Sequence, residues 1–301
     1  MPSAAHAQPT TTIDDAEVAR FSAIADEWWD ETGKFAPLHK LNPTRLTYLR
    51  DQLIRHFSCD GASATPFNNI HSGSASHPSL AKKRDAMDTE ETSAHLVHEA
   101  SEEAPLQADL KPKWMNALTL VDIGCGGGLI AEPMARLGAA VTGIDASATN
   151  ISVASLHAKN AGLAIDYRAT TAEQLALEGA QFDVVFALEI IEHVDNVDLF
   201  YDSIAALVKP GGVLVLSTLN RTAKSYALGI VGAEYVLRWL PKGTHTWSKF
   251  IKPSEMAAAL RQRGFHAVDI TGITFSPINW SFSLNSKDLS VNYLMVATPS
   301  K

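Results

Sequence analysis

Two carboxylates and an imidazole occupy neighbouring positions in the second half of the chain. Glu189, Glu192 and His193 follow an apolar run at 182–188. If a helical turn begins there, the three side chains fall at positions i, i+3 and i+4, on one face of the turn. Such a set can hold a divalent ion, which lowers the pKa of a bound hydroxyl and orients it. Oxygen ligands suit Mg²⁺, whereas imidazole is more usual on zinc or iron.

Two other interpretations of these residues remain open. Without a metal, His193 is a candidate general base that takes a proton from a substrate hydroxyl. The acidic residues are also compatible with a purely structural helix start, because carboxylates are favourable at the positive end of a helix dipole.

A cluster of glycines forms the strongest local motif. The run Val121-Asp122-Ile123-Gly124-Cys125-Gly126-Gly127-Gly128 stands between a strand pattern and a helix pattern. A dinucleotide fingerprint needs glycine at its first, third and sixth positions, and here the sixth is Leu129, which disfavours a nicotinamide dehydrogenase. The cluster instead permits a tight turn with a ligand lying against the backbone. Cys125 is expected to be a small packing residue.

Asp145 ends the next strand pattern, at Gly143-Ile144-Asp145. A carboxylate about 20 residues beyond the first glycine suits the two hydroxyls of a ribose and disfavours a 2′-phosphate. Gly124, Gly126 and Asp145 together therefore predict a nucleoside-binding turn.

Alternating strand and helix patterns from Trp114 onward predict the elements that position these residues. Strands separated by helices imply an α/β fold with a mostly parallel sheet and right-handed crossovers. Ligands of such sheets bind at the carboxyl ends of the strands, where both motifs are placed. The expected strands are 118–122, 140–144, 165–168, 182–188, 213–218, 267–270 and 291–298, and the expected helices are 129–137, 150–160, 196–208 and 253–263.

Three segments precede this α/β pattern. Residues 1–13 are small and polar and are expected to be disordered. Residues 14–57 show helical spacing, with Asn42 expected to cap a second helix that Pro43 begins. Residues 58–112 predict a low-complexity surface insertion, in which positions 85–109 hold eight acids and no Lys or Arg. Since the whole chain has a net charge of −8, the acidity belongs to the stretch 85–109 and not to the rest of the chain.

Composition excludes several classes of function. Lys and Arg number 25 against 33 Asp and Glu, so no broad basic surface exists and nucleic acid is not an expected partner. Two cysteines are too few for a disulfide framework or a thiolate zinc site. No apolar run reaches the roughly 20 residues that span a bilayer.

The apolar run 225–240, SYALGIVGAEYVLRWL, is interrupted by Glu234 and Arg238. It predicts an amphipathic helical lid, and its residues Tyr226, Tyr235 and Trp239 are of types that favour a bilayer interface. Ordinary packing within a subdomain is the alternative.

Four blocks taken together resemble the successive motifs of class I S-adenosylmethionine-dependent methyltransferases: 121–130, 143–145, 182–194 and 207–218. The resemblance implies a seven-stranded, mostly parallel sheet with helices on both faces and a reversed last hairpin. It also implies a catalytic domain over 113–301, with N-terminal helices and a lid at 221–250.

Further blocks, outside the cofactor motifs, resemble ubiquinone biosynthesis O-methyltransferases. They include Trp28-Trp29-Asp30, Pro37-Leu38-His39, Thr218-Leu219-Asn220-Arg221 and Pro241-Lys242-Gly243-Thr244-His245. The likeness covers roughly 20–57 and 113–298, and the residues at 229–231 and 244–247 are more similar to mitochondrial members than to bacterial ones.

The resemblance implies contacts with S-adenosylmethionine at Arg45, Gly124, Asp145 and Leu188. Arg45 would pair with the methionine carboxylate. It further implies that Glu189, Glu192 and His193 are magnesium ligands and catalytic residues. The implied reaction is methylation of a ring hydroxyl on polyprenylated dihydroxybenzoate, and again on demethylated ubiquinol.

The same resemblance implies a polyprenylated phenolic substrate, a membrane surface and other ubiquinone-biosynthesis proteins in a complex as partners. The implied location is peripheral, on the matrix side of the mitochondrial inner membrane, or on the cytoplasmic membrane face in a bacterium. Two rival functions stay open. A soluble catechol O-methyltransferase would turn over short and long prenyl substrates equally, and a non-catalytic S-adenosylmethionine-binding subunit would bind without transfer.

Overall fold

A computed structural model of the chain describes residues 11–58, 114–236, 243 and 246–300. Nearly all of the predicted insertion at 58–112 lies outside these residues, as do residues 1–10. Much of the second half of the predicted lid also lies outside them, including Trp239, and the side chain of Tyr235 is not described.

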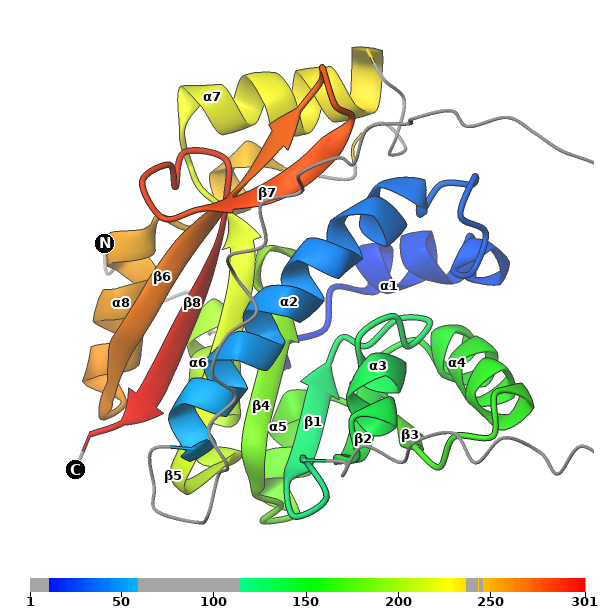
Figure 1. Cartoon of the computed structure of the whole chain (residues 1–301), viewed down its shortest axis with the longest axis vertical. Coiled ribbons are helices and arrows are strands. Elements are labelled where there is room, and N and C mark those ends of the chain that lie inside the picture. The colour runs from blue at the N-terminus through cyan, green and yellow to red at the C-terminus, as the bar shows by residue number, and fades with distance from the viewer. Residues whose placement is uncertain (1–10, 59–113, 237–242, 244–245, 301) are drawn as a thin grey trace, which may run out of the picture.

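One mixed sheet forms the centre of the described structure (Figure 1), with the strand order β3-β2-β1-β4-β5-β8-β6-β7. Strands β1 to β5 are parallel, whereas β8 runs antiparallel between β5 and β6. This confirms the α/β class and the reversed last hairpin. The strands are β1 (Thr119–Ile123), β2 (Ala140–Asp145), β3 (Asp166–Ala169), β4 (Phe182–Leu188), β5 (Val208–Leu219), β6 (Phe265–Ser276), β7 (Ser281–Asn285) and β8 (Asn292–Pro299).

The sheet has eight strands in the described part of the chain, one more than the resemblance implies. The additional strand is β7, which pairs with the end of β6 from Gly272 to Ser276 as an antiparallel hairpin. The sequence pattern did not predict it, because its residues are mostly exposed and carry little apolar periodicity.

Helices cover both faces of the sheet, and the central strands are therefore largely apolar. Along β4, Val184 and Phe186 pack into one core and Val185 and Ala187 into the other, as the two-residue period of a strand requires. Helix α2 crosses one face, and α6 and α8 lie behind the other (Figure 1). The helices that surround the sheet are α2 (Ala36–Ser58), α3 (Ala131–Arg136), α4 (Ala148–Asn160), α5 (Ala172–Leu177), α6 (Val197–Ala206) and α8 (Pro253–Gln262).

The N-terminal region differs from the sequence expectation at two points. Helix α2 begins at Ala36 and contains Pro43 in its interior, so the predicted cap at Asn42 is wrong. The side chain of Asn42 instead donates to the carbonyl of Leu129 at 2.7 Å. Residues 11–13 are ordered rather than disordered, because Thr12 is buried and its hydroxyl donates to Glu173 at 2.7 Å. This attachment leads into α1 (Asp15–Ser22) and the short helix η1 (Ala25–Glu27).

The predicted lid begins with a short helical turn, α7 (Ala223–Ser225), that continues as the helix η3 (Tyr226–Val236). Thr222 caps it by accepting a hydrogen bond from the backbone of Ser225. The helix and the β6–β7 hairpin lie at the same end of the molecule (Figure 1). The two further short helices are η2 (Ile191–His193) and η4 (Trp247–Lys249). Within the described ranges, no helix has both the length and the apolar character needed to cross a membrane.

Candidate active site

The glycine-rich turn after β1 has the geometry predicted for a ligand-binding loop. Gly124, Gly126 and Gly128 have φ values of 71°, 53° and 93°, in the left-handed region that favours glycine. The turn is closed by Asp145, whose carboxylate accepts hydrogen bonds from the backbone N–H of Gly126 at 3.0 Å and of Ser147 at 2.8 Å. Burial raises the pKa of Asp145. The glycine turn and Asp145 at the end of β2 therefore lie together, as the sequence predicted.

Aromatic side chains from the N-terminal region cover this turn. Trp28 stacks on Phe35 with ring centroids 3.8 Å apart, and its indole N–H donates to Asn150 at 3.0 Å. The indole of Trp29 donates to the carbonyl of Gly127 at 3.0 Å. A methyl group on Gly126 would lie 2.4 Å from the Trp28 ring, so the turn needs glycine there for space as well as for conformation.

Cys125 within the turn is buried, and burial raises the pKa of its thiol. A thiol held in its neutral form is a poor nucleophile. Cys125 is therefore the packing residue that its position predicted.

Arg45 reaches the cavity from α2. Its side chain is 4% exposed, and Nη2 donates to the Asn42 amide oxygen at 2.8 Å. Within the described structure, its Nε has no hydrogen-bond partner. Arg45 lines the cavity, and a buried guanidinium with an unused donor is suited to an acidic ligand group.

Asp122, at the end of β1, is the nearby acid that the sequence analysis did not single out. It is 3% exposed, and burial raises its pKa to about 7, although the charge of Arg45 acts in the opposite direction. Its position in the glycine motif, two residues before Gly124, could have identified Asp122 from the sequence as a residue of the site.

The chain turns sharply after Leu188, the last residue of β4. Glu189 has a φ of 54°, which is uncommon for a residue with a side chain. Its Oε1 accepts hydrogen bonds from the Ser217 hydroxyl at 2.7 Å and from the Asn292 amide at 2.9 Å. Neighbouring strands therefore hold Glu189 in place, and its side chain lines the cavity together with Leu188.

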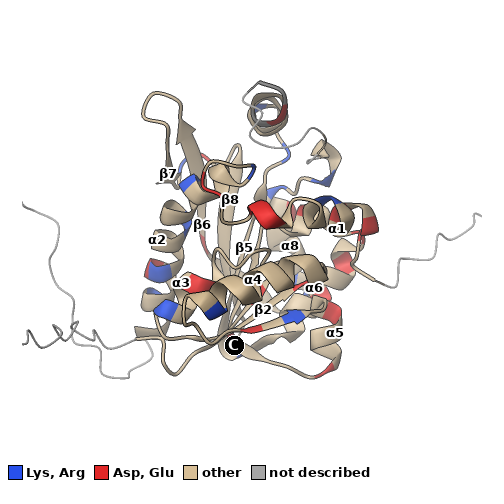
Figure 2. Ribbon diagram, turned by 90° about the vertical axis from the view of Figure 1, so that its right-hand side faces the viewer, with Lys and Arg blue, Asp and Glu red and all other residues tan. Residues whose placement is uncertain are grey.

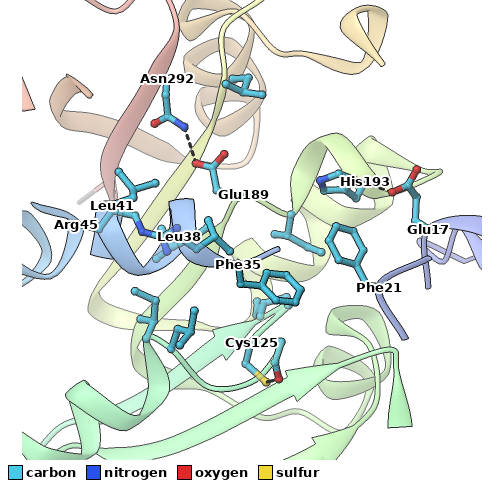
Figure 3. A pocket seen from close by; sticks show the side chains of 18 of the residues that line it. Glu17, Phe21, Phe35, Leu38, Leu41, Arg45, Cys125, Glu189, His193 and Asn292 are labelled. Atoms are coloured by element: carbon cyan, nitrogen blue, oxygen red, sulfur yellow. Dashed lines mark hydrogen bonds and ion pairs between the residues drawn. The ribbon is translucent and has the colours of Figure 1, made fainter. Parts of the chain in front are cut away.

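Glu192 and His193 point to different surroundings. Glu192 is 3% exposed, and within the described residues neither of its carboxyl oxygens has a hydrogen-bond partner. Burial, followed by the charge of Glu189, raises the pKa of Glu192 well above its ordinary value. His193 lies 3.0 Å from Glu17 of α1, measured from Nδ1 to Oε2. Figure 3 shows Glu189 with Asn292 on one side of the pocket and His193 with Glu17 on the other.

The predicted arrangement of Glu189, Glu192 and His193 on one helical face is wrong. The helical turn begins only at Ile191, and the left-handed backbone at Glu189 places that residue outside it. In the part of the chain that the structure describes, no three His, Cys, Asp or Glu side chains are placed to share an ion. The three residues in this conformation do not fit the expected magnesium site.

One cavity of about 810 Å³ is lined by the glycine turn, Asp145, Arg45, Glu189 and His193, whereas Glu192 is not among its lining residues. Its polar end contains the glycine turn, Asp145 and Arg45, and its other end is apolar. The cavity also includes Glu17, which the sequence analysis missed, because nothing in the sequence connects α1 with His193. The apolar end is lined by Leu219, Leu228, Ile273, Phe275 and Phe282.

Comparisons with known proteins agree with this geometry. A family model described as a methyltransferase domain matches residues 121–216, from the glycine turn to β5. A ubiquinone biosynthesis O-methyltransferase of Roseobacter denitrificans is 48% identical, over 95% of this chain and 96% of the relative. The proteins of the same name from Cereibacter sphaeroides and Brucella anthropi are 46% and 45% identical, each over 95% of this chain and 96% of the relative.

The chain belongs to the ubiquinone biosynthesis O-methyltransferase family. It is therefore an S-adenosylmethionine-dependent methyltransferase, as the resemblance implied. In this member of the family, Trp28 packs against Gly126 and Gly127, and Trp29 donates to the carbonyl of Gly127, so the N-terminal block contacts the glycine turn directly.

Proposed function

We propose that this chain methylates a ring hydroxyl of polyprenylated catechols, 3,4-dihydroxy-5-polyprenylbenzoate and demethylubiquinol, in ubiquinone biosynthesis. The observation that carries the proposal is the single cavity that joins a nucleoside-type turn to an apolar chamber. The names of the relatives support the substrate class. When bound, S-adenosylmethionine supplies an already activated sulfonium methyl group, so no covalent enzyme intermediate is needed.

The polar end of the cavity is suited to that cosubstrate. The unpartnered Nε of Arg45 supports pairing with the methionine carboxylate. Asp145 accepts hydrogen bonds from the backbone of Gly126 and Ser147 and from the Asn150 amide, so that one acceptor site, on Oδ2, is left for a ribose hydroxyl. Gly124 and Gly126 stay assigned to the cosubstrate because they shape the left-handed turn, and in this structure the Ile190 and Trp28 side chains pack against them. Leu188 lies at the end of β4, where a backbone contact is available.

His193 is the residue we assign to proton transfer. It lines the cavity, on the side opposite Glu189 (Figure 3). A bond forms between the catechol oxygen and the methyl carbon while the carbon–sulfur bond breaks, and the phenolic proton passes to the imidazole. We also assign Glu189 to the catalytic site, where hydrogen bonds from Ser217 and Asn292 hold its carboxylate. Glu192 is buried and is not among the residues that line the cavity, and proton transfer here needs no metal ion.

The apolar end is suited to a prenyl tail and opens near an exposed apolar surface. Leu228 and Val231 of η3 are 54% and 40% exposed, and Ile278 and Trp280 at the hairpin tip are 92% and 42% exposed. The sequence from Thr271 to Ser286 has no Lys, Arg, Asp or Glu, and Figure 2 shows an uncharged hairpin tip.

We infer that this end of the molecule docks on a membrane surface, from which a polyprenyl substrate enters. The corresponding location is the matrix face of the mitochondrial inner membrane, or the cytoplasmic membrane face in a bacterium. Association with other ubiquinone-biosynthesis proteins stays a prediction from the family resemblance.

A methyl-transfer assay tests the reaction. A catechol with a short prenyl chain is compared with the same ring without a tail, for the wild type and His193→Gln. We expect higher kcat/KM for the prenylated ring and a kcat about 100-fold lower in the variant. Equal turnover of both rings would support a soluble catechol methyltransferase. Activity lost on chelation and restored by Mg²⁺ would contradict metal-free proton transfer.

Liposome sedimentation tests the membrane surface. Ile278→Ser combined with Trp280→Ser should reduce the bound fraction, because both side chains are exposed and apolar. Leu177→Ser on α5 is the control, since Leu177 is 81% exposed and α5 lies at the end of the molecule opposite the β6–β7 hairpin (Figure 1). Equal loss of binding in the control would refute a specific docking surface.

A further inference from the structure

The first residues that the structure describes form a strap, defined here as residues 11–14, at the polar end of the cavity. The backbone N–H and the hydroxyl of Thr12 donate to Glu173 at 3.0 and 2.7 Å, and its carbonyl accepts from the N–H of Asp195 at 3.0 Å. Thr12 is only 6% exposed. It therefore bridges α5, which follows β3, and the loop after η2, which follows β4.

The strap lies beside the part of the cavity assigned to the cosubstrate. Residues 12–14 of the strap line the cavity, as do residues 170–172, which follow β3. The N–H of Thr170 donates to the carbonyl of Asp145 at 3.1 Å, so this wall continues from the strand end that is expected to bind the ribose. Glu173, the next residue, holds the strap against that wall.

Polar contacts also hold α1, which continues from the strap. They join α1 and its N-cap to three separate segments: Asp14 to Lys249 at 2.9 Å, Glu17 to His193 at 3.0 Å, and Ser22 to Ser147 at 2.6 Å. The strap and α1 together therefore cover the cavity from the end of β2 to the segment that follows the lid.

Apolar packing is weak along α1 and strong immediately after it. Val18 and Phe21, the larger apolar side chains of α1, are only partly buried. By contrast, Ala25 and Trp28 are 1% and 8% exposed. Polar contacts that water can replace cost little to break, whereas exposing buried apolar side chains is unfavourable. Residues 11–22 can therefore open while the chain from Ala25 onward stays in place.

The cosubstrate needs a route at this end of the cavity. S-adenosylmethionine and its product S-adenosylhomocysteine carry a charged amino-acid group. The other end of the cavity is lined by apolar residues, including Leu228, Ile273 and Phe282. Passage of a charged group through apolar surroundings is unfavourable, because the charge loses its hydration there. The polar end, where the strap lies, is the better route for exchange.

Glu173 is suited to hold the strap closed because its contacts are charge-assisted. Burial raises the pKa of Glu173, but hydrogen bonds from the backbone and hydroxyl of Thr12 outweigh burial and lower it. The carboxylate is therefore ionised, and hydrogen bonds to an ionised group are about twice as strong as neutral ones. Its Oε1 accepts from the Thr12 N–H and Oε2 from the Thr12 hydroxyl, and the Thr11 hydroxyl adds a contact of 3.2 Å to Oε1.

We propose that residues 11–14 are a strap that closes over the cosubstrate: Glu173 is its latch during methyl transfer, and the strap opens together with α1 to admit S-adenosylmethionine and to release S-adenosylhomocysteine. Ala23 and Ile24, which separate α1 from η1, form the hinge. This inference goes beyond the proposed function. It concerns the exchange of the cosubstrate and does not depend on which phenol is methylated.

Stopped-flow binding of S-adenosylhomocysteine to the full-length chain tests the strap, with tryptophan fluorescence as the signal because Trp28 lines the cavity. Glu173→Gln keeps the size of the latch but removes its charge. Since the latch closes the strap in both the free and the bound protein, we expect the association and dissociation rate constants each to rise about 10-fold. The dissociation constant should then change less than about threefold.

Two further variants make the test specific. Thr12→Val removes one hydrogen bond to the latch without changing the size of the side chain, and both rate constants should rise by a smaller factor. Glu178→Gln is the matched control, because Glu178 directly follows α5, is exposed and lies 3.7 Å from Arg168 rather than near the strap. Its rate constants should equal those of the wild type. If Glu173→Gln fails to fold, Thr12→Val decides the test.

Two results would overturn the strap. Faster dissociation with unchanged association would mean that residues 11–14 are a fixed wall that contacts the ligand. Unchanged rate constants in both Glu173→Gln and Thr12→Val would mean that the latch does not limit exchange. Either result leaves the proposed function intact, which fails instead if the wild type methylates no prenylated catechol.

Discussion

Replacement of Arg45 by methionine should weaken cosubstrate binding about 10- to 100-fold. Arg45 is 4% exposed, and its guanidinium is fixed by Asn42, which is in turn held by the carbonyl of Leu129. A hydrogen bond to a charged group contributes about 1.5–3 kcal/mol. At about 1.4 kcal/mol per tenfold change, the loss of one such bond corresponds to the stated range.

Methionine is a suitable replacement because it is unbranched and fills an irregular buried space. The substitution also removes the cation that lowers the pKa of Asp122, so that pKa should rise further above about 7. Asp122 can then take up a proton, which limits the cost of leaving a buried carboxylate without its cation.

Calorimetric titration with two ligands makes the test specific. S-adenosylhomocysteine retains the amino-acid carboxylate, whereas 5′-methylthioadenosine has the nucleoside but lacks that carboxylate. Arg45→Met should weaken binding of the first ligand and leave the second within about twofold. Arg50→Met is the matched control, because Arg50 lies on the same helix, is about half exposed and pairs with its neighbour Asp51.

Two results would refute the assignment of Arg45. Binding of S-adenosylhomocysteine that changes less than threefold would mean that the guanidinium does not contact the ligand carboxylate. An equal weakening of both ligands would mean that Arg45 supports the shape of the pocket rather than recognising the amino-acid part.

Three further predictions concern the turn, the N-terminal attachment and pH. Gly126→Ala should lower the melting temperature and weaken binding of S-adenosylhomocysteine, because a left-handed residue costs about 1–2 kcal/mol and the new methyl would meet Trp28; unchanged values in calorimetry would contradict this. Glu173→Gln should speed hydrogen exchange at 11–22, since the acceptor of the Thr12 hydrogen bonds is weakened; exchange equal to the wild type would show that α1 is held elsewhere. In the folded protein the carboxyl of Asp122 has a pKa of about 7, against an ordinary value of 3.8. The native state therefore keeps this proton to a higher pH than the unfolded chain does. The protonated carboxyl contributes to stability at low pH, and that contribution is lost as pH rises through about 7. Relative to Asp122→Asn, the wild-type unfolding free energy should therefore fall between about pH 4 and pH 7, by a few kcal/mol at most, in urea titrations; parallel curves would contradict a buried carboxyl that titrates near neutrality.

Local patterns in the sequence determined the elements and the cosubstrate turn. The strand β4 was predicted with the bounds that the structure shows, because a strand buried on both faces is mostly apolar, and only Asp183 interrupts the apolar residues of β4. The glycine cluster and Asp145 were also predicted from the sequence. Left-handed backbone favours glycine, and binding of a ribose at the end of a strand favours Asp or Glu, so few residue types fit these positions.

Tertiary structure alone decided the catalytic contacts. The spacing of Glu189, Glu192 and His193 suggested one helical face, but hydrogen bonds from Ser217 and Asn292 on neighbouring strands hold Glu189 outside the helical turn. The partner of His193 is Glu17, and the sequence offers no periodicity that connects positions so far apart. Sequence patterns show the backbone conformation and the burial that each segment favours. The docking of α1 depends instead on complementary surfaces, which exist only once the sheet has formed.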